Sequence, residues 1–259
     1  MRIACFIFGS PGSGKTYITK YINKLLGLGN IDTFNMSIDE RVSKIDEYKK
    51  KLTGKIKSSD SNDVDYLSEL SATLYYKIRR IHQDKLLNSQ INELKQFIKK
   101  PNCLVTIEAT AIKEDDTYQC NLQGTYLELL KDAGFNIVFL YLYNSLDTIK
   151  SRIEKRNKNV INSIRNNEYI KDMRLVSYAN ILKMRDIVLD TIKYLLCEKR
   201  DNNIIILYKN KLLLYYNSDK NVYKYNAIDE QPNDIDIKDI DRFKKNIKYL
   251  TNKIKSGIY

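Results

Sequence analysis

Eight residues near the start of the chain have the types and spacing of a phosphate-binding loop. Gly9-Ser10-Pro11-Gly12-Ser13-Gly14-Lys15-Thr16 fits the pattern G-x-x-x-x-G-K-[S/T] and directly follows an apolar run, residues 3–8. Glycines let backbone N–H groups curl around a phosphate, and the positive end of a following helix points at it. Lys15 would supply a charge to the β- and γ-phosphates of a nucleotide, and the Thr16 hydroxyl would hold Mg²⁺. The sequence therefore predicts a nucleotide site with residues 9–16 as its phosphate cradle.

Two carboxylates follow segments that read as strands. Asp39 comes after a strand expected at 31–36, and Glu108 ends the apolar run 103–108. Ligands of parallel sheets gather at the carboxyl ends of the strands. Asp39 is the candidate base that orients an acceptor hydroxyl and takes its proton, although its local sequence fits a helix cap equally well. Glu108 fits a ligand of a substrate hydroxyl, a water-mediated ligand of Mg²⁺, or a strand-end acid satisfied by nearby backbone.

Four arginines follow the last predicted parallel strand. Arg152 and Arg156 lie one helical turn apart and share a face, and Arg165 and Arg174 follow across the Asn-rich stretch 157–167. A basic segment of this kind can close over a triphosphate and exclude water, and guanidinium groups grip phosphate bidentately. For each of the four arginines taken singly, the alternative to a role in phosphate binding is a place on the solvated face of a charged helix.

Composition excludes several classes of protein. The chain has 259 residues, 43% of them apolar, and no run approaches the length of a membrane span, so we expect a cytoplasmic protein with no membrane partner. The four cysteines are scattered, which favours reduced thiols without zinc or disulfides. The formal charge of +12 fits either a nucleic-acid partner or an AT-biased coding sequence that disperses lysines over many helix faces. A single histidine, His82, makes histidine-based nucleophilic chemistry improbable.

Hydrophobic periodicity predicts strands that alternate with helices. Helices are expected at 16–25, 39–52, 64–99 as two helices meeting near 88–89, 122–132 and 146–156, with a long helix at 169–199 that has room for one interruption. Strands are expected at 31–36, 103–108 and 137–143. A loop is expected at 53–62, a hairpin at 204–208 and 212–216, and a last helix in the tail. This alternation predicts one α/β domain over residues 1–259 with a parallel sheet and right-handed crossovers. Its expected additions are a helical insertion at 53–100, a lid at 157–168 and a C-terminal helical extension at 227–259.

Taken in order, these segments resemble the zeta-toxin-like P-loop kinases, within the wider nucleoside-monophosphate-kinase-like group. The resemblance covers roughly residues 3–216. It begins with the loop GSPGSGKT, continues with Ser37-Ile38-Asp39 in the place of the family's catalytic aspartate, and includes CLVTIEAT at 103–110, similar to a strand ending in I-E-G-T. A helix closing with KDAGF at 131–135, a strand, the arginine-bearing segment and the late hairpin follow.

The resemblance implies a three-layer P-loop kinase fold and ATP- and Mg²⁺-dependent phosphorylation of a hydroxyl. In the zeta toxins this hydroxyl is the 3′-hydroxyl of the amino sugar of UDP-N-acetylglucosamine. Carried over by position, Asp39 is the base, Glu108 and Thr110 contact substrate, Lys15 and Thr16 bind ATP and Mg²⁺, and Arg156 and Arg165 belong to the lid, with Arg152 placed nearly as well as Arg156. A toxin of this family is expected to have an inhibitory antitoxin partner.

The chain departs from the family pattern at two positions. Ile112 stands where the family places an arginine that holds substrate phosphate, and Lys113 is a candidate to replace its charge. Ile38 stands where the family favours asparagine before the catalytic aspartate. The substrate is therefore less determined by the resemblance than the reaction class.

Two other functions remain open from the sequence. A 5′-hydroxyl polynucleotide kinase shares the loop, base and lid and would use the positive charge, but such kinases carry Asp-x-x-Arg, and here Arg41 lies two residues after Asp39. A nucleotide-binding toxin or regulatory module without kinase activity is the alternative from another class. A GTPase is disfavoured because no Asn-Lys-x-Asp segment is present.

Overall fold

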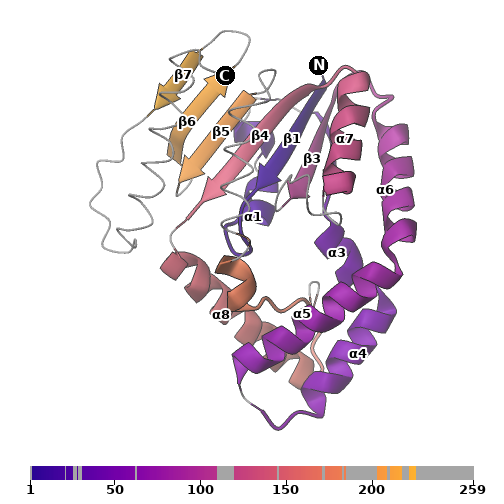
Figure 1. The fold of residues 1–259 in the computed structure, drawn as a ribbon, viewed down its shortest axis with the longest axis vertical. Coiled ribbons are helices and arrows are strands. Elements are labelled where there is room, and N and C mark those ends of the chain that lie inside the picture. Colours follow the sequence, from indigo (N-terminus) through magenta and orange to yellow (C-terminus); the bar gives the residue numbers. More distant parts are fainter. Residues whose placement is uncertain are drawn as a thin grey trace.

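A computed structural model gives the fold of the chain (Figure 1) and describes residues 2–20, 22–25, 28, 31–61, 63–109, 120–144, 146–170, 173–182, 184, 203–208, 211–217 and 222–225. The strands are β1 Arg2–Phe8, β2 Asp32–Met36, β3 Cys103–Ala109, β4 Asn136–Tyr143, β5 Asn203–Tyr208, β6 Lys211–Asn217 and β7 Val222–Tyr225. The helices are α1 Lys15–Thr19, α2 Ile22–Leu25, α3 Ile38–Ser43, α4 Asp46–Lys57, α5 Val64–Ile81, α6 Gln83–Phe97, α7 Cys120–Asp132 and α8 Leu146–Arg165. Over these ranges, none of the helices combines the length and apolar character that crossing a membrane requires.

A seven-stranded sheet forms the centre of the molecule, in the order β2-β3-β1-β4-β5-β6-β7. The pairs from β2 to β5 are parallel, and β6 and β7 extend the sheet in antiparallel fashion. In the register of β1 and β3, Ile7 lies beside Glu108 and Phe8 beside Ala109, so the two strands end together. The α/β fold with a parallel central sheet and a late hairpin, predicted from the sequence, is confirmed; β7 was not predicted.

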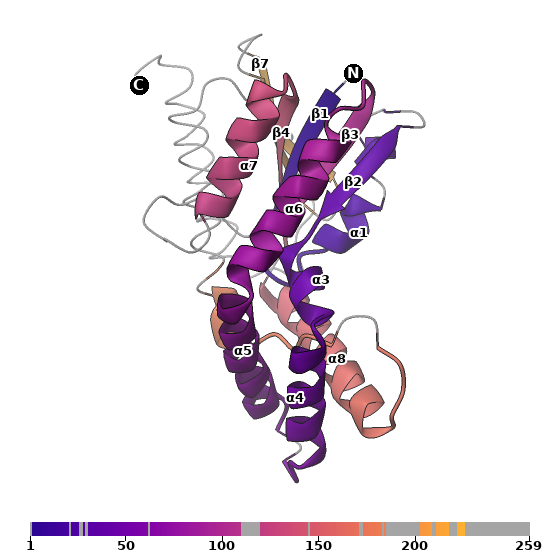
Figure 2. The same cartoon turned by 90° about the vertical axis from the view of Figure 1, so that its right-hand side faces the viewer.

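Side chains of β1 alternate between the two faces of the sheet, as the pleat of a strand requires. Cys5 and Ile7 pack with Ile18 of α1 on one face. On the opposite face Phe6 and Phe8 stack in a row with Phe139 of β4. Helices α6 and α7 cover that second face, while α1 lies against the first (Figure 2). Burial on both faces explains why the strands read as continuous apolar runs.

A second hydrophobic core lies beyond the carboxyl edge of the sheet, in a helical arm made of α4, α5 and α8 (Figure 1). Tyr48, Leu52 and Ile56 recur every four residues along α4 and are fully buried. They pack against the apolar stripe of α5 and against α8. Burying one such side chain contributes roughly 1.5–3 kcal/mol, so these three positions alone anchor α4 in the arm.

Several predicted helix boundaries in the first half were wrong. The polar helix expected at 39–52 is two helices, because Lys44 and Ile45 separate α3 from α4. The loop expected at 53–62 is shorter at its start, since α4 continues through Gly54 to Lys57 and presents Ile56 to the core of the arm. The junction expected near residues 88–89 lies at His82, where α5 ends and α6 begins.

The segment 157–168 was expected to be a loop that forms the lid, but α8 continues through it to Arg165. Val160, Ile161 and Ile164 of α8 are buried in the arm, and this packing overrides the polarity of the intervening asparagines. The helix expected at 169–199 is not helical over its described residues 169–170 and 173–177, and a helical turn follows at 178–182. The rest of that prediction and the C-terminal helical extension at 227–259 lie outside the described residues.

An extended segment, residues 173–177, crosses the arm after α8, and we call it the strap. Asn157, buried on α8, donates from Nδ2 to the carbonyl oxygen of Val176 at 2.9 Å. Its Oδ1 accepts from the N–H of the same residue at 3.1 Å. One asparagine therefore replaces the two partners that a neighbouring strand would otherwise supply.

Replacing Asn157 with alanine removes both of these hydrogen bonds and leaves two buried backbone groups unpaired. We expect the free energy of unfolding to fall by about 2–4 kcal/mol. Urea unfolding of the variant measures this change. Asn162→Ala is the matched control, because Asn162 lies on the same helix but is exposed, and it should change stability by less than about 0.5 kcal/mol. Equal effects of the two substitutions would contradict this account of the strap.

Candidate active site

The predicted phosphate-binding loop joins the end of β1 to the start of α1. Gly14 is the N-cap of α1 and has a φ of 101°, which is open to glycine and strained for other residues. A Cβ at Gly9 would lie 2.4 Å from the Ser13 Oγ and 3.1 Å from the Leu142 carbonyl oxygen. The loop therefore curls so tightly that its backbone closes around a small concave space.

A buried hydroxyl inside the loop indicates what this space is suited to hold. The Ser13 Oγ is inaccessible to solvent and has no hydrogen-bond partner within the described part of the chain. The loop itself is held from outside, because Asn144 donates to the Ser13 carbonyl oxygen at 2.8 Å and Arg152 to the Gly12 carbonyl oxygen at 3.3 Å. A free donor in a rigid curl that opens at a helix N-terminus fits a phosphate.

Lys15 projects into the same loop from the first position of α1. Its Nζ donates to the carbonyl oxygen of Gly9 at 2.6 Å and to that of Ser10 at 3.1 Å. Burial lowers the pKa of the Lys15 ammonium to about 8; the carboxylates of Glu108 and Asp39 oppose this shift, and two nearby arginines add to it. An anion bound in the loop would reverse this shift, since it favours the charged form.

Glu108 lies beside the loop because β3 ends where β1 ends. The Thr16 hydroxyl donates to its Oε2 at 3.3 Å, and the Thr19 hydroxyl donates to its Oε1 at 3.2 Å. Burial raises the pKa of the Glu108 carboxyl, although Lys15 and the two hydroxyls favour the ionised form. The hydroxyl of Thr16 and the carboxylate of Glu108 thus form a pair of hard oxygen donors of the kind that Mg²⁺ prefers.

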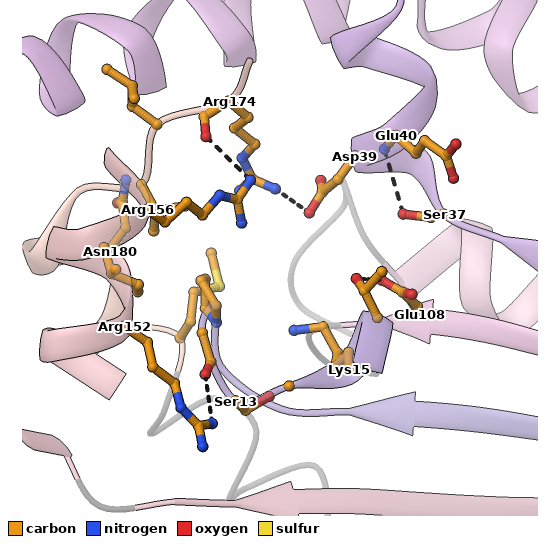
Figure 3. A pocket seen from close by; sticks show the side chains of 18 of the residues that line it. Ser13, Lys15, Ser37, Asp39, Glu40, Glu108, Arg152, Arg156, Arg174 and Asn180 are labelled. Atoms are coloured by element: carbon orange, nitrogen blue, oxygen red, sulfur yellow. Dashed lines mark hydrogen bonds and ion pairs between the residues drawn. The ribbon is translucent and has the colours of Figure 1, made fainter. Parts of the chain in front are cut away.

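Asp39 occupies the first turn of α3, which Ser37 caps by accepting a hydrogen bond from the N–H of Glu40. The Asp39 carboxylate accepts a hydrogen bond from the Tyr75 hydroxyl on one oxygen and forms an ion pair with Arg174 through the other (Figure 3). Burial opposes its ionisation, but Arg174 and the Tyr75 hydroxyl outweigh it and hold the pKa of Asp39 at about 2. Since the side chain is still 45% exposed, this carboxylate remains accessible.

The strap delivers Arg174 to this position. Its guanidinium lies over the Tyr75 ring, 4.3 Å from the ring centre. Arg156 donates to the Arg174 carbonyl oxygen at 3.2 Å, and the next residue, Leu175, donates its N–H to the Ser71 hydroxyl at 3.3 Å. The backbone on both sides of the Arg174 Cα is therefore fixed by the helical arm.

One cavity of about 890 Å³ connects these groups, between the carboxyl edge of the sheet and the helical arm. Figure 3 shows Lys15, Glu108 and Asp39 pointing into it from one side and Arg152, Arg156 and Arg174 from the other. Its cationic lining residues are Lys15, Lys20, Arg79, Arg152, Arg156 and Arg174, and its acidic ones are Asp39, Glu40 and Glu108. The excess of positive charge suits a polyanionic ligand.

The chain matches no protein-family model and no curated protein sequence. Similar solved structures include one from the PezAT chromosomal toxin–antitoxin system of the human pathogen Streptococcus pneumoniae, at 15% identity and a TM-score of 0.49 over 99% of this chain and 87% of that one. Deoxyadenosine kinase from M. mycoides, solved with bound dATP, gives 15% identity and a TM-score of 0.36 over 98% and 100% of the two chains. An AvrRxo1-ORF1:-ORF2 complex gives 12% identity and a TM-score of 0.45 over 95% of this chain and 71% of that one.

The fold is an α/β fold in which a glycine-rich loop joins the first parallel strand to the helix that follows it. Its parallel strands, the loop between β1 and α1, and the helices on both faces of the sheet agree with the fold that the sequence predicts.

The fold brings most of the predicted site residues together. Those that line the cavity are Pro11, Gly12, Ser13, Gly14, Lys15, Thr16, Asp39, Glu108, Arg152 and Arg156, while Gly9 and Ser10 accept hydrogen bonds from Lys15. Arg165 does not line it, since its guanidinium donates to the carbonyl oxygens of Ser59 and Ser61 at the tip of the arm. Thr110 lies outside the described residues.

Sequence reasoning missed Tyr75, Arg79 and Asn144, and it did not single out Arg174 from the other arginines. Tyr75 and Arg79 belong to an amphipathic helix, where a cavity-facing residue has the same spacing as a core residue. Asn144 directly follows β4, so its place at the carboxyl end of a parallel strand was the available signal.

Removing the Tyr75 hydroxyl should make Asp39 easier to protonate. In Tyr75→Phe the ring still packs against Arg174, but one hydrogen bond to the carboxylate is lost, so we expect the pKa of Asp39 to rise by roughly one pH unit. Carbon NMR of the Asp39 carboxyl group from about pH 1.5 to 5, a range that includes both titrations, measures this. Tyr48→Phe is the matched control, because the Tyr48 hydroxyl is buried in the same arm but bonds Ser71. An unchanged titration in Tyr75→Phe would contradict the role of this hydroxyl.

Binding of ATP should protonate Lys15 in alkaline solution. With a pKa near 8, about three-quarters of Lys15 is neutral at pH 8.5, and bound phosphates would draw a proton onto it. Calorimetry in buffers of different ionisation enthalpy should therefore show an uptake of roughly half a proton or more per ATP at pH 8.5 and little at pH 6.5. Lys15→Arg, charged at both pH values, should show none. Binding heats that do not depend on the buffer would refute this.

Proposed function

We propose that this protein is an ATP- and Mg²⁺-dependent kinase that transfers the γ-phosphoryl group to a hydroxyl of a small acceptor molecule. One observation carries the proposal: a single cavity holds a phosphate-binding loop with its lysine, an ionised and accessible carboxylate, and several arginines. Phosphoryl transfer requires this combination of positioning and charge neutralisation and little else from the protein.

The loop end of the cavity would bind the nucleotide. The backbone of residues 9–14 and the Ser13 hydroxyl would surround the phosphates, and Lys15 would move its ammonium from the loop carbonyls to the β- and γ-phosphates. The Thr16 hydroxyl and the Glu108 carboxylate would hold Mg²⁺, and bound Mg²⁺–ATP would supply the phosphoryl group. Both donors fit because they already lie within hydrogen-bond distance of each other.

Asp39 would orient the acceptor hydroxyl. A carboxylate with a pKa near 2 is a poor store for a proton at neutral pH, so its contribution is to accept a hydrogen bond from the hydroxyl and to direct the oxygen's lone pair. The proton then leaves to solvent or to the product phosphate. A loose transition state needs little proton transfer before the phosphoryl group moves, so an orienting carboxylate is sufficient.

Arg152, Arg156 and Arg174 are proposed to neutralise charge on the transferred group, because they face the loop across the cavity. Arg165 is left with a structural role, holding the loop between α4 and α5 against the end of α8. Thr110 is proposed as a substrate contact only through the family resemblance.

The acceptor is proposed to be a small molecule, with a sugar nucleotide such as UDP-N-acetylglucosamine first among the candidates. A cavity of about 890 Å³ lies within the range of pockets for small ligands and must hold the nucleotide as well. Resemblance to the zeta toxins supports the sugar nucleotide, an inhibitory antitoxin partner and a cytoplasmic location.

The rival assignment, a 5′-hydroxyl polynucleotide kinase, is supported only by the overall charge of +12. Its expected arginine near the catalytic aspartate does not serve the cavity here. Arg41 instead binds Glu93 of α6 through both of its terminal nitrogens, at 2.9 and 2.5 Å. We therefore keep nucleic acid as the second choice of acceptor.

Transfer of label from γ-labelled ATP with Mg²⁺ tests the proposal, with UDP-N-acetylglucosamine, a 5′-hydroxyl oligonucleotide and water as acceptors. Asp39→Asn keeps the shape of the side chain and removes its charge, so we expect kcat to fall by about 10²–10⁴-fold while ATP still binds. Label on the oligonucleotide would establish the rival kinase. ATP binding without transfer to any hydroxyl acceptor would leave a nucleotide-binding module and overturn the kinase assignment.

A further inference from the structure

Arg79 is a buried cation in the wall of the cavity. Helix α5 presents a stripe of residues to the cavity, Ala72, Tyr76 and Arg79, at the spacing of one helix face. Arg79 is only 7% exposed, whereas its neighbour Arg80 on the same helix is exposed to solvent. Burial of an arginine is costly unless its charge is compensated.

No carboxylate among the described residues forms an ion pair with Arg79, and its guanidinium has no hydrogen-bond partner within the same ranges. Its charge favours the ionised form of the Asp39 carboxylate. Both oxygens of that carboxylate are already engaged by Tyr75 and Arg174. Within the described part of the chain, none of the five N–H donors of Arg79 is engaged, and Arg79 lines a cavity that a ligand can reach.

The balance of charge at this end of the cavity is positive. Arg79 and Arg174 lie near Asp39, and the other acid there, Glu40, is paired with Lys44 at 2.8 Å. Glu108 is occupied at the loop end by two threonine hydroxyls and lies near Lys15. A neutral ligand beside Asp39 would leave the charge of Arg79 uncompensated in a partly dehydrated space.

We propose that Arg79 anchors an anion-binding subsite at the Asp39 end of the cavity, and that the acceptor carries a phosphate or carboxylate group which this guanidinium binds. The planar fork of arginine matches either group with two parallel hydrogen bonds. The anion would hold the acceptor by a group other than the reacting one, leaving the hydroxyl to meet Asp39. That the bound molecule is a phosphoryl acceptor rests on the proposed kinase function, whereas anion binding at Arg79 does not depend on it.

Calorimetry on the full chain saturated with Mg²⁺ and a non-hydrolysable ATP analogue tests the subsite, with inorganic pyrophosphate and malonate as separate probes. We expect wild-type protein to bind at least one of them and Arg79→Met to bind it at least tenfold more weakly. Arg80→Met is the matched control and should bind as the wild type does. Arg79→Lys, which keeps the charge without the fork, should lie between. Pyrophosphate binding alone would indicate a phosphorylated acceptor, and malonate binding alone a carboxylic acid.

Equal binding by Arg79→Met and wild type, or no binding of either probe to wild type, would overturn the subsite. Thermal unfolding of the two methionine variants checks that both remain folded, and Arg79→Lys preserves the test if the methionine variant does not. Failure of the ATP analogue to bind would count against the proposed function alone. In that case titration of pyrophosphate into Lys15→Met and into Lys15→Met/Arg79→Met still decides the subsite, because the loop lysine is then absent from both.

Discussion

The ion pair between Asp39 and Arg174 joins the two halves of the molecule. Asp39 follows a strand of the sheet, whereas Arg174 belongs to the strap that the helical arm holds, so the pair spans the cavity that separates them. Tyr75 completes the arrangement by donating to the carboxylate and stacking beneath the guanidinium. Such partners favour the ionised form of a partly buried carboxylate, and Val42, on the same helix as Asp39, adds apolar packing against the arm.

The same cavity gathers cations whose mutual repulsion lowers the stability of the free protein, and a bound anion would reduce this repulsion. Burial and neighbouring arginines favour the neutral form of Lys15, and Arg79 is buried without an ion pair to any carboxylate that the structure describes. Like charges held close together in a site of low polarity destabilise the free protein and favour any anion that enters. The free protein is therefore destabilised at the position where charge would develop in the proposed phosphoryl transfer.

The hydrophobic core of the arm exists apart from that of the sheet, and its packing decides where the arginines point. Tyr48 and Leu52 pack α4 against α5. The Ser71 hydroxyl of α5 forms hydrogen bonds with both the Tyr48 hydroxyl and the N–H of Leu175 in the strap. Asn157 fixes the strap from the other side. The polar site is therefore positioned by buried side chains that never touch a ligand, which is how a rigid scaffold holds reactive groups in place.

The sequence by itself determined the features that local patterns encode: the phosphate-binding loop, the buried strands that read as apolar runs, the parallel order implied by alternating helices, and the late hairpin. Glu108 could be placed because register follows from where two strands end. The length of α8 and the non-helical strap could not be predicted from the sequence, because buried contacts with the arm override local polarity. Only the tertiary structure brought Tyr75 and Arg174 to Asp39 and set Arg79 in the cavity wall, because those contacts join residues far apart in the chain and depend on how two separate cores pack.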